Sequence, residues 1–182
     1  MKKQLSQKRK RQNKPTIHHP FPNKYYDGLS SDNKEQQIKE LKQSRKLYKK
    51  GIYLSRSKKT SFKTKRSAHL VEFENKYGVN IADKQAVYKV TGITHKAQEK
   101  ILNKGRGAFY SSGSRPNQSA ESWALARLAS VILKHGAYKV DRHVLIENKC
   151  NNIKQPPKHK TLVVKCNKIT DNTVHKFKKC VR

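Results

Sequence analysis

The sequence predicts a mainly α protein, in which a small helical central domain is flanked by extended basic arms. Apolar residues recur at helical spacing in several windows between residues 67 and 149, and glycines follow the ends of most of these windows. Hydrophobic residues make up 34% of the 182 residues, which is enough for one modest core. Positive charge is concentrated outside the central domain, where like-charged blocks are typical of interaction tails.

Charge and pattern together divide the protein into four segments. We expect a basic disordered arm over residues 1–24, a basic helix plus an extended segment over 25–66, a helical core domain over 67–149 and a basic tail over 150–182. The whole sequence has 43 Lys and Arg against 12 Asp and Glu, a net charge of +31. Such a charge repels itself unless a polyanion or solvent relieves it. The composition therefore favours nucleic acid or an acidic protein surface as partner, and disfavours a small-molecule enzyme.

The first expected element is a basic helix that begins near Asp32, with Glu35 three residues later or Ser31 as an alternative cap. Gly51 is a plausible end of this helix. Residues 52–66 show no helical period and place aromatic side chains among Ser, Thr, Lys and Arg. This pattern predicts an extended segment that lies on another surface.

Three short helices are expected next. Ser67 can cap a helix through Tyr77, Asp83 can cap one over 84–91, and Thr94 can cap one that ends near Lys104. The last two helices, around a glycine turn, have the outline of a helix-turn-helix. A plain helical hairpin is the alternative.

Residues 105–116, GRGAFYSSGSRP, predict a glycine-rich loop. Glycines permit close approach of a ligand, arginines can donate to phosphate in forks, and Tyr110 can stack on a base. The loop lacks the GK[ST] ending of a Walker motif. It can be a backbone clamp for nucleic acid, or a structural loop whose Phe109 fills the core.

The following helix has the strongest apolar period, with Asn117 or Ser119 as its cap and Gly136 as its end. No acid or amide lies three residues beyond either cap, so we expect no strict capping box. Trp123 is expected in the core. Arg127 lies among the apolar positions and can pair with Glu121, Asp141 or Glu147, or reach phosphate.

The remaining sequence offers weak signals for metal chemistry. Residues 140–149 are ambiguous between strand and helix, and Asp141, Glu147 and Lys149 loosely resemble a nuclease set that would hold Mg²⁺. The tail has one strand candidate over 161–166. Its cysteines and histidines, with Cys150, show no Cys-x-x-Cys pair, so free thiols are favoured over zinc. We predict no catalytic residue, no metal and no cofactor.

The predicted nucleic-acid contacts are ten cations of the first 66 residues, two cations on the second hairpin helix, and four groups of the glycine-rich loop. These are Lys8, Arg9, Lys10, Arg11, Arg56, Lys58, Lys59, Lys63, Lys65, Arg66, Lys96, Lys100, Arg106, Tyr110, Ser112 and Arg115.

Two stretches carry a resemblance to known proteins. They are residues 25–69, with Tyr26-x-Gly28-Leu29-Ser30 and Ser61-Phe62-Lys63, and residues 104–141, with Ser111-Ser112-Gly113-Ser114-Arg115-Pro116 before Ser122-Trp123. Both resemble a set of uncharacterised proteins from large eukaryotic DNA viruses. The resemblance implies a viral setting and presence in the particle, and it transfers no catalytic residue.

The expected function is that of a basic, non-enzymatic, virion-associated protein that contacts phosphates of nucleic acid, DNA in preference to RNA. The alternative is a minor capsid or cement protein whose arms thread between capsid subunits, and a metal-dependent nuclease ranks third. We expect no membrane partner, because no window approaches the roughly 18 apolar residues of a span. We also expect no small-molecule substrate, because the composition disfavours a small-molecule enzyme. The expected locations are the virion and, during infection, the host cytoplasm or nucleus.

Overall fold

The computed structural model describes residues 21–150 and 152–155, and these residues form six α-helices and no strand. A short 3-10 helix, η1, comes first. The elements are η1 (Asn23–Tyr25), α1 (Ser31–Tyr48), α2 (Ala68–Tyr77), α3 (Lys84–Thr91), α4 (His95–Ser111), α5 (Ala120–Ile132) and α6 (Gly136–Glu147). The predicted mainly α class is therefore confirmed. The basic run from Lys8 to Arg11 and the strand candidate over 161–166 lie outside the described residues.

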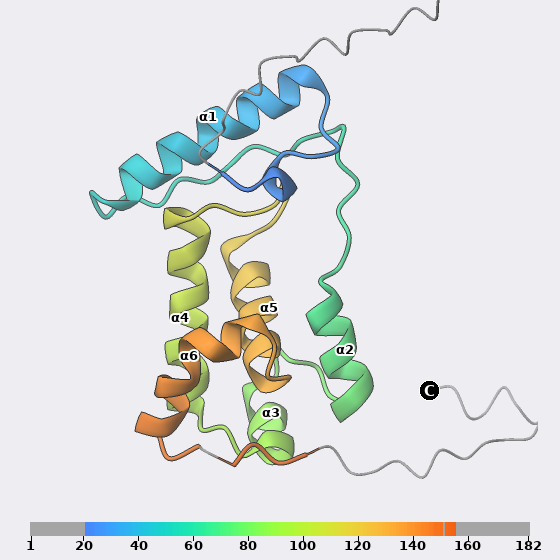
Figure 1. Ribbon diagram of the computed structural model, residues 1–182, viewed down its shortest axis with the longest axis vertical. Helices are drawn as coiled ribbons and strands as arrows, with labels where there is room; N and C mark the ends of the chain where they lie inside the picture. Colours follow the sequence, from blue (N-terminus) through green and yellow to red (C-terminus); the bar gives the residue numbers. More distant parts are fainter. Residues whose placement is uncertain (1–20, 151, 156–182) are drawn as a thin grey trace, which may run out of the picture.

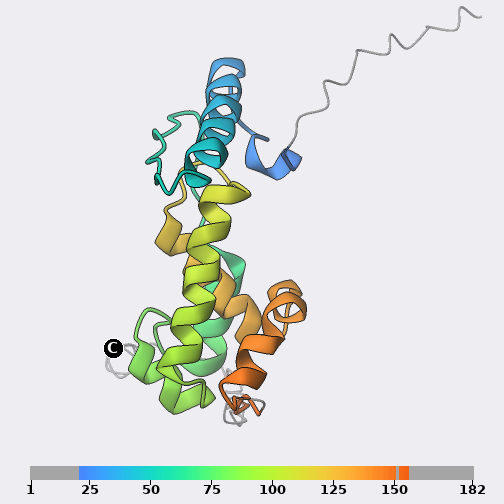
Figure 2. The ribbon, with the colours of Figure 1, turned by 90° about the vertical axis from the view of Figure 1, so that its left-hand side faces the viewer.

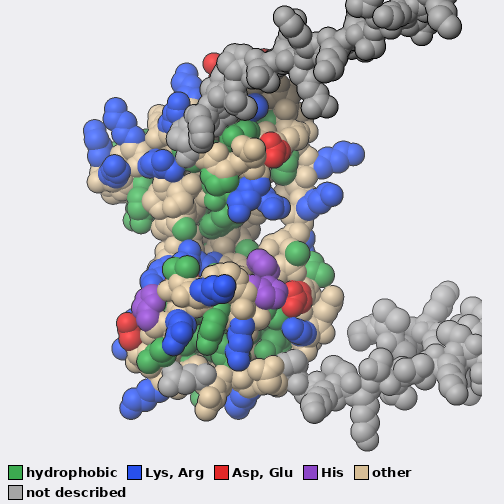
Figure 3. Space-filling view, in the orientation of Figure 1, with side chains coloured by type: hydrophobic (Ala, Val, Ile, Leu, Met, Phe, Trp, Pro, Cys, Tyr) green, Lys and Arg blue, Asp and Glu red, His purple; other side chains and the backbone are tan. Residues whose placement is uncertain are grey.

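The helices form two regions that differ in construction (Figures 1 and 2). We call residues 21–66, which include η1 and α1, the cap, and residues 67–150, which hold α2 to α6, the body. In the body α4 and α5 lie side by side, and α1 crosses over the end of α4. The molecule narrows between the two regions (Figure 3).

The body has an aliphatic core to which all five of its helices contribute. Phe73, Val87, Ile101 and Leu128 are among its fully buried side chains. This core is the larger of the two hydrophobic clusters in the described residues. The body is thus the part of the protein that hydrophobic burial can stabilise alone.

The cap has a smaller, aromatic core and depends on the end of α4. Phe21, Tyr25, Tyr26, Ile38 and Leu41 form its buried cluster. Trp123 of α5 packs against this cluster, with its ring 5.9 Å from that of one cap tyrosine in an edge-on arrangement. The cap cluster is thus completed by a body residue.

The last carbonyl groups of α4 are hydrogen-bonded by side chains of the cap. Arg56 Nη2 donates to the Phe109 carbonyl at 3.4 Å, Ser44 Oγ to that of Tyr110 at 3.1 Å, and Arg45 Nε to that of Ser111 at 2.9 Å. Carbonyls at a helix C-terminus have no partner within the helix, and cations suit the negative end of its dipole. The cap therefore sits on α4 and satisfies the carbonyls at its C-terminal end.

The expected end of a helix at Gly105 was wrong, since α4 continues through Gly105 to Ser111. A Cβ on residue 105 would lie 2.5 Å from the Cα of Ala124 in α5. The glycine is there because two helices approach closely, not because the backbone turns. Only residues 112–119 form the connection, so the predicted glycine-rich loop is shorter than expected.

Several caps were predicted correctly. The Asp83 side chain accepts from two amides of α3, and Thr94 accepts from the Ala97 amide. Ser119 caps α5, but the expected lack of a capping box was wrong because the Ser122 hydroxyl returns the bond. The ambiguous stretch 140–149 is mostly helical, since α6 runs from Gly136 to Glu147.

No described helix combines the length and the apolar character that crossing a bilayer requires.

Candidate functional site

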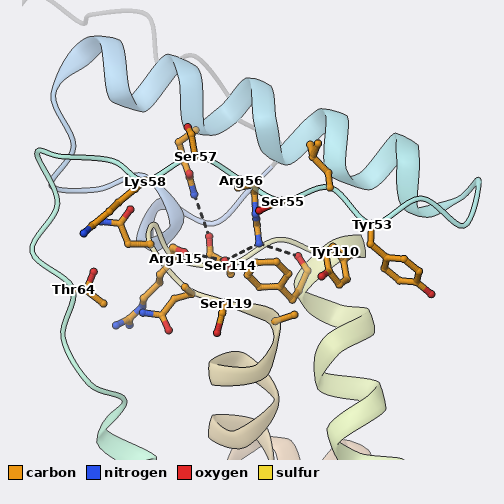
Figure 4. A pocket seen from close by; sticks show the side chains of 16 residues that line it. Tyr53, Ser55, Arg56, Ser57, Lys58, Thr64, Tyr110, Ser114, Arg115 and Ser119 are labelled. Carbon is orange, nitrogen blue, oxygen red and sulfur yellow. Dashed lines mark hydrogen bonds between the residues drawn. The ribbon is translucent and has the colours of Figure 1, made fainter.

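A groove of about 600 Å³ lies between the cap and the top of the body (Figure 4). One wall is the extended segment 53–58. The other wall is the end of α4, the connection 114–119 and the first residue of α5, while Gln37 of α1 also contributes. The lining includes three cations and no Asp or Glu. We call this feature the cationic groove.

The extended segment has no regular secondary structure, and Asn117 fixes its position. The Asn117 Oδ1 accepts from the Lys59 amide at 2.7 Å, and its Nδ2 donates to the carbonyls of Lys59 and Phe62 at 2.9 and 3.1 Å. Asn117 itself has a φ of +57°, a region that Asn tolerates better than most residues. The side-chain amide of Asn117 thus supplies the hydrogen bonds that a neighbouring strand would otherwise give to this segment.

Arg56 forms the centre of the groove. Its guanidinium carbon lies 3.7 Å from the centre of the Phe109 ring, and Nη2 donates to Ser114 Oγ at 3.0 Å. Nη1 is buried and has no hydrogen-bond partner among the described residues. Burial lowers the pKa of Arg56 to about 10, against the opposing effect of Glu40, so the group remains a cation at neutral pH.

Lys58 and Arg115 stand at one end of the groove, near Thr64 (Figure 4). Both side chains are exposed, and neither forms a hydrogen bond or an ion pair with any other residue that the structure describes. A ligand could therefore bind these cations without displacing a carboxylate. Both were predicted as contacts although they lie far apart in sequence, and the fold brings them to one groove.

Aromatic rings line the opposite end of the groove. Tyr110 stacks on Tyr48 with ring centres 6.1 Å apart, and Tyr53 meets Tyr110 edge-on at 5.0 Å. Tyr53 is 65% exposed, which is unusual for a large aromatic side group without a partner to cover it. The groove thus has cations at one end and tyrosines at the other, and of these tyrosines Tyr53 is exposed.

Lys59 corrects the sequence prediction, because it cannot contact a ligand from the surface. It is fully buried, with Nζ 2.9 Å from Glu40 Oε1 and donating to Ser57 Oγ at 2.6 Å. A buried ammonium needs such partners to offset its desolvation. Lys59 therefore anchors the segment to α1 from within.

Arg106 also differs from the expectation of an ordered phosphate contact. It lies on α4, where its guanidinium donates to Glu99 at 2.7 Å, to Asn103 at 2.7 Å and to Glu121 at 2.8 Å. Two carboxylates neutralise this cation, and its pKa rises because their hydrogen bonds favour the charged form. A phosphate would have to displace both acids.

The hairpin of α3 and α4 does not present the surface of a recognition helix. Lys100 pairs with Glu147 at 3.2 Å, and Glu99 pairs with Lys84 at 2.6 Å, so the exposed face of α4 carries mixed charge. Lys96 is exposed but lies in the first turn of α4, far along the helix from the groove. The plain hairpin interpretation therefore fits better.

The other predicted contacts lie around the groove. Lys63 is exposed, and Lys65 and Arg66 line a hollow of about 400 Å³ that shares Thr64 and Ser119 with the groove. Arg66 also forms an ion pair with Glu74. Ser112 lines a separate hollow between α4 and α6, and Lys8 to Arg11 lie outside the described residues.

The nuclease set is not assembled. Asp141 is fully buried, and it accepts two hydrogen bonds from Arg127, at 2.6 and 3.0 Å, with Lys104 at 3.6 Å. Glu147 is exposed and pairs with Lys100. This settles the partner of Arg127, and it places Asp141 in a buried ion pair with two cations, apart from the exposed Glu147.

Sequence reasoning missed Asn117 as an anchor and Gln37 as a lining residue. Gln37 is buried and donates to the carbonyls of Tyr25 and Ser114 at 3.2 and 3.4 Å. Its place among apolar positions of α1 was a signal, since buried amides generally serve backbone groups. Asn117 was considered only as a helix cap.

One comparison with known proteins gives a result. A family model described as a family of unknown function, DUF5824, matches residues 22–149, which include the cap and nearly the whole body. No curated protein and no solved structure matches the sequence.

Proposed function

We propose a function from the geometry of the cationic groove, because the protein belongs to DUF5824, a family whose function is unknown. The groove binds the sugar–phosphate backbone of a nucleic acid without catalysing a reaction. The observation that carries this proposal is the lining: Arg56, Lys58 and Arg115 share one groove with several hydroxyls and no carboxylate.

The chemistry of the lining suits phosphodiesters. Guanidinium and ammonium groups bind phosphate oxygens with charge-assisted hydrogen bonds, and each contact releases a counterion from the nucleic acid. Ser55 and Thr64 add hydroxyl donors of the kind that position a backbone without reading its sequence. A small anion would leave most of the groove unfilled, whereas a strand can run along it.

The aromatic end favours a strand with accessible bases over a closed duplex. Tyr53 and Tyr110 can stack on unpaired bases, and such stacking is sequence-tolerant because every base has a π face. Preference for DNA over RNA rests on the resemblance of residues 25–69 and 104–141 to proteins of large DNA viruses. That resemblance also supports a virion location.

A non-enzymatic role is supported by the ion pairing of the acids. Metal-dependent nucleases need carboxylates that can coordinate Mg²⁺. Asp141 is instead held by Arg127 and Lys104 in the interior of the body. We therefore expect Asp141→Asn to lower the free energy of unfolding without changing nucleic-acid binding.

The test compares two double variants of the full-length protein by fluorescence anisotropy on a labelled single-stranded oligonucleotide. Lys58→Gln with Arg115→Gln removes two groove cations. Each phosphate contact contributes roughly −0.7 to −0.9 to the slope of log K against log salt concentration. The slope for this variant should therefore be less negative than that of the parent by about 1.5.

The matched control is Lys89→Gln with Lys139→Gln, which removes the same charge from exposed positions on α3 and α6. The basic segments outside the described residues stay in both variants and give a common background. If both double variants lost the same affinity and the same salt dependence, the groove would not be the binding site. That result would still be consistent with general binding of polyanions by the protein.

Virion location is tested by fractionating purified particles. A DNA-bound protein should leave the shell with the genome. Retention on empty shells would favour the alternative role, that of a minor capsid or cement protein whose basic arms lie between coat subunits.

A further inference from the structure

Two histidines and a glutamate meet on the body, outside the lining of the groove. His69 Nδ1 and His135 Nδ1 are 3.1 Å apart, and His135 Nε2 is 3.6 Å from Glu72 Oε1. One ligand atom from each of the three residues lies within 4.8 Å of the other two. All three side chains are partly buried and partly open to solvent.

The fold brings this cluster together from two elements. His69 and Glu72 are three residues apart in α2, so they share one helical face. His135 follows Lys134, whose φ of +58° closes α5 with the two bonds of a Schellman motif: the His135 amide donates to the Ser130 carbonyl and the Lys134 amide to that of Val131. The turn that ends α5 therefore aims His135 at α2.

The spacing matches the coordination of one metal ion. Two imidazole nitrogens that bind the same tetrahedral zinc at about 2.0–2.1 Å lie roughly 3.3 Å apart. Without a metal, two nitrogens this close can share only one proton. We propose that His69, Glu72 and His135 bind a single zinc ion, with solvent as the remaining ligand.

The ligand types select the metal. Two imidazoles and one carboxylate suit zinc and related transition metals, whereas Mg²⁺ and Ca²⁺ prefer oxygen ligands. The carboxylate supplies negative charge in a protein that is otherwise strongly positive. The Glu72 carboxylate lies nearest to His135 Nε2, whereas the short distance between the two histidines joins their Nδ1 atoms. Glu72 would therefore have to move toward an ion held by those Nδ1 atoms, and its partly exposed side chain can do so by bond rotation.

Protons and a lysine compete for the same atoms. Lys76 Nζ lies 3.4 Å from Glu72 Oε1 on the same helix, but this pair is exposed and weak. Burial, and then the neighbouring His135, lower the pKa of His69, so this imidazole is neutral at pH 7 and available to a metal.

Zinc at this position would join α2 to the junction between α5 and α6. The ion would bind the folded state in preference to the unfolded one, and would raise the melting temperature. The proposed role is a structural clamp on the body, independent of the function proposed for the groove.

The experiment uses the full-length protein, freed of metal by a chelator and kept reduced with a phosphine. Zinc should raise the melting temperature by about 5–10 °C at 100-fold excess over its dissociation constant. Co²⁺ should give a visible spectrum of tetrahedral nitrogen and oxygen ligation, without the near-ultraviolet charge-transfer band that cysteine ligands produce.

His69→Gln and Glu72→Gln should each abolish most of this shift and remove one zinc equivalent in equilibrium dialysis. His143→Gln is the control, because it removes an exposed histidine of α6 that lies outside the cluster. Metal-free melting temperatures show that each variant folds. Equal zinc stoichiometry and equal shifts in the parent and His69→Gln would overturn the proposal, as would a thiolate band in the cobalt complex.

Discussion

The cap and the body carry their charges in opposite ways. In the body most acids are paired: Glu99 with Lys84 and Arg106, Asp141 with Arg127, and Glu147 with Lys100. In the cap the buried pair of Lys59 with Glu40 supports the extended segment. At the boundary with the body, Lys58 of the cap and Arg115 of the α4–α5 connection have no carboxylate partner among the described residues. Two of the unneutralised cations therefore stand at the groove, where a polyanion can bind them.

The two regions also differ in what stabilises them. The body buries a large aliphatic cluster, while the cap has five buried apolar residues and relies on hydrogen bonds to α4 and Asn117. Polar contacts can be rearranged at lower cost than a packed core, so the candidate binding site lies where the fold is more polar. The predictions below test this division.

The largest effect is expected from Phe73→Ala in the body. Phe73 is fully buried, so its removal should lower the free energy of unfolding by about 3–5 kcal/mol. Because the cap rests on α4, the unfolding midpoints measured by helical circular dichroism and by Trp123 fluorescence should fall together in a urea titration. If Trp123, which packs on the cap cluster, kept its parental midpoint, the cap would be independent of the body.

Gly105→Ala should come next, because it forces apart α4 and α5. The new Cβ would fall 2.5 Å from the Ala124 backbone, so we expect a loss of about 1–3 kcal/mol despite the better helix propensity of alanine. Gly136→Ala is the control, since nothing lies within 4 Å of its Cβ position. Urea unfolding of both variants measures the difference, and equal stability would contradict the close helix approach.

Asn117 should have a more local effect. Asn117→Gly keeps the positive φ but removes three hydrogen bonds to the segment, for a loss of about 1–2 kcal/mol. Asn117→Ala adds backbone strain of about 1 kcal/mol. Trypsin should cleave first within residues 56–66 in both variants, as mapped by mass spectrometry. Unchanged cleavage there would show that the segment is held by other contacts.

The smallest effect concerns the pH dependence of the body. The lowered pKa of His69, caused first by burial and then by His135, means that the unfolded state binds more protons as pH falls below about 6.5. Stability present above that pH should therefore decline as the pH falls below about 6.5. His69→Gln, measured with a chelator present, should reduce this decline, whereas His143→Gln should not.

Much of the body could be predicted from local signals. Asp83 and Thr94 cap helices as expected, because a side-group oxygen near free amides acts within a few residues. Gly78 and Gly92 end α2 and α3 in the left-handed conformation for the same local reason. Gly105 was misread, because a glycine that serves helix packing has the same sequence signal as one that serves a turn.

The candidate site was predicted in composition but not in arrangement. Arg56, Lys58, Tyr110 and Arg115 were among the sixteen predicted contacts, and these four line one groove. Nothing local distinguished Lys58 from its neighbour Lys59, one exposed and one fully buried beside Glu40. That difference depends on which side of the extended segment faces α1, which residues far away in the sequence determine.

Residue types and their spacing over a few positions were enough to predict the mainly α class, the side-chain caps of α3, α4 and α5, and the strong positive charge. Which cations are neutralised, buried or free depended on how the helices pack. Charge pairing is a matter of distance in space. The contacts of Arg106 with Glu121, of Arg127 with Asp141 and of His69 with His135 all join residues that are distant in sequence.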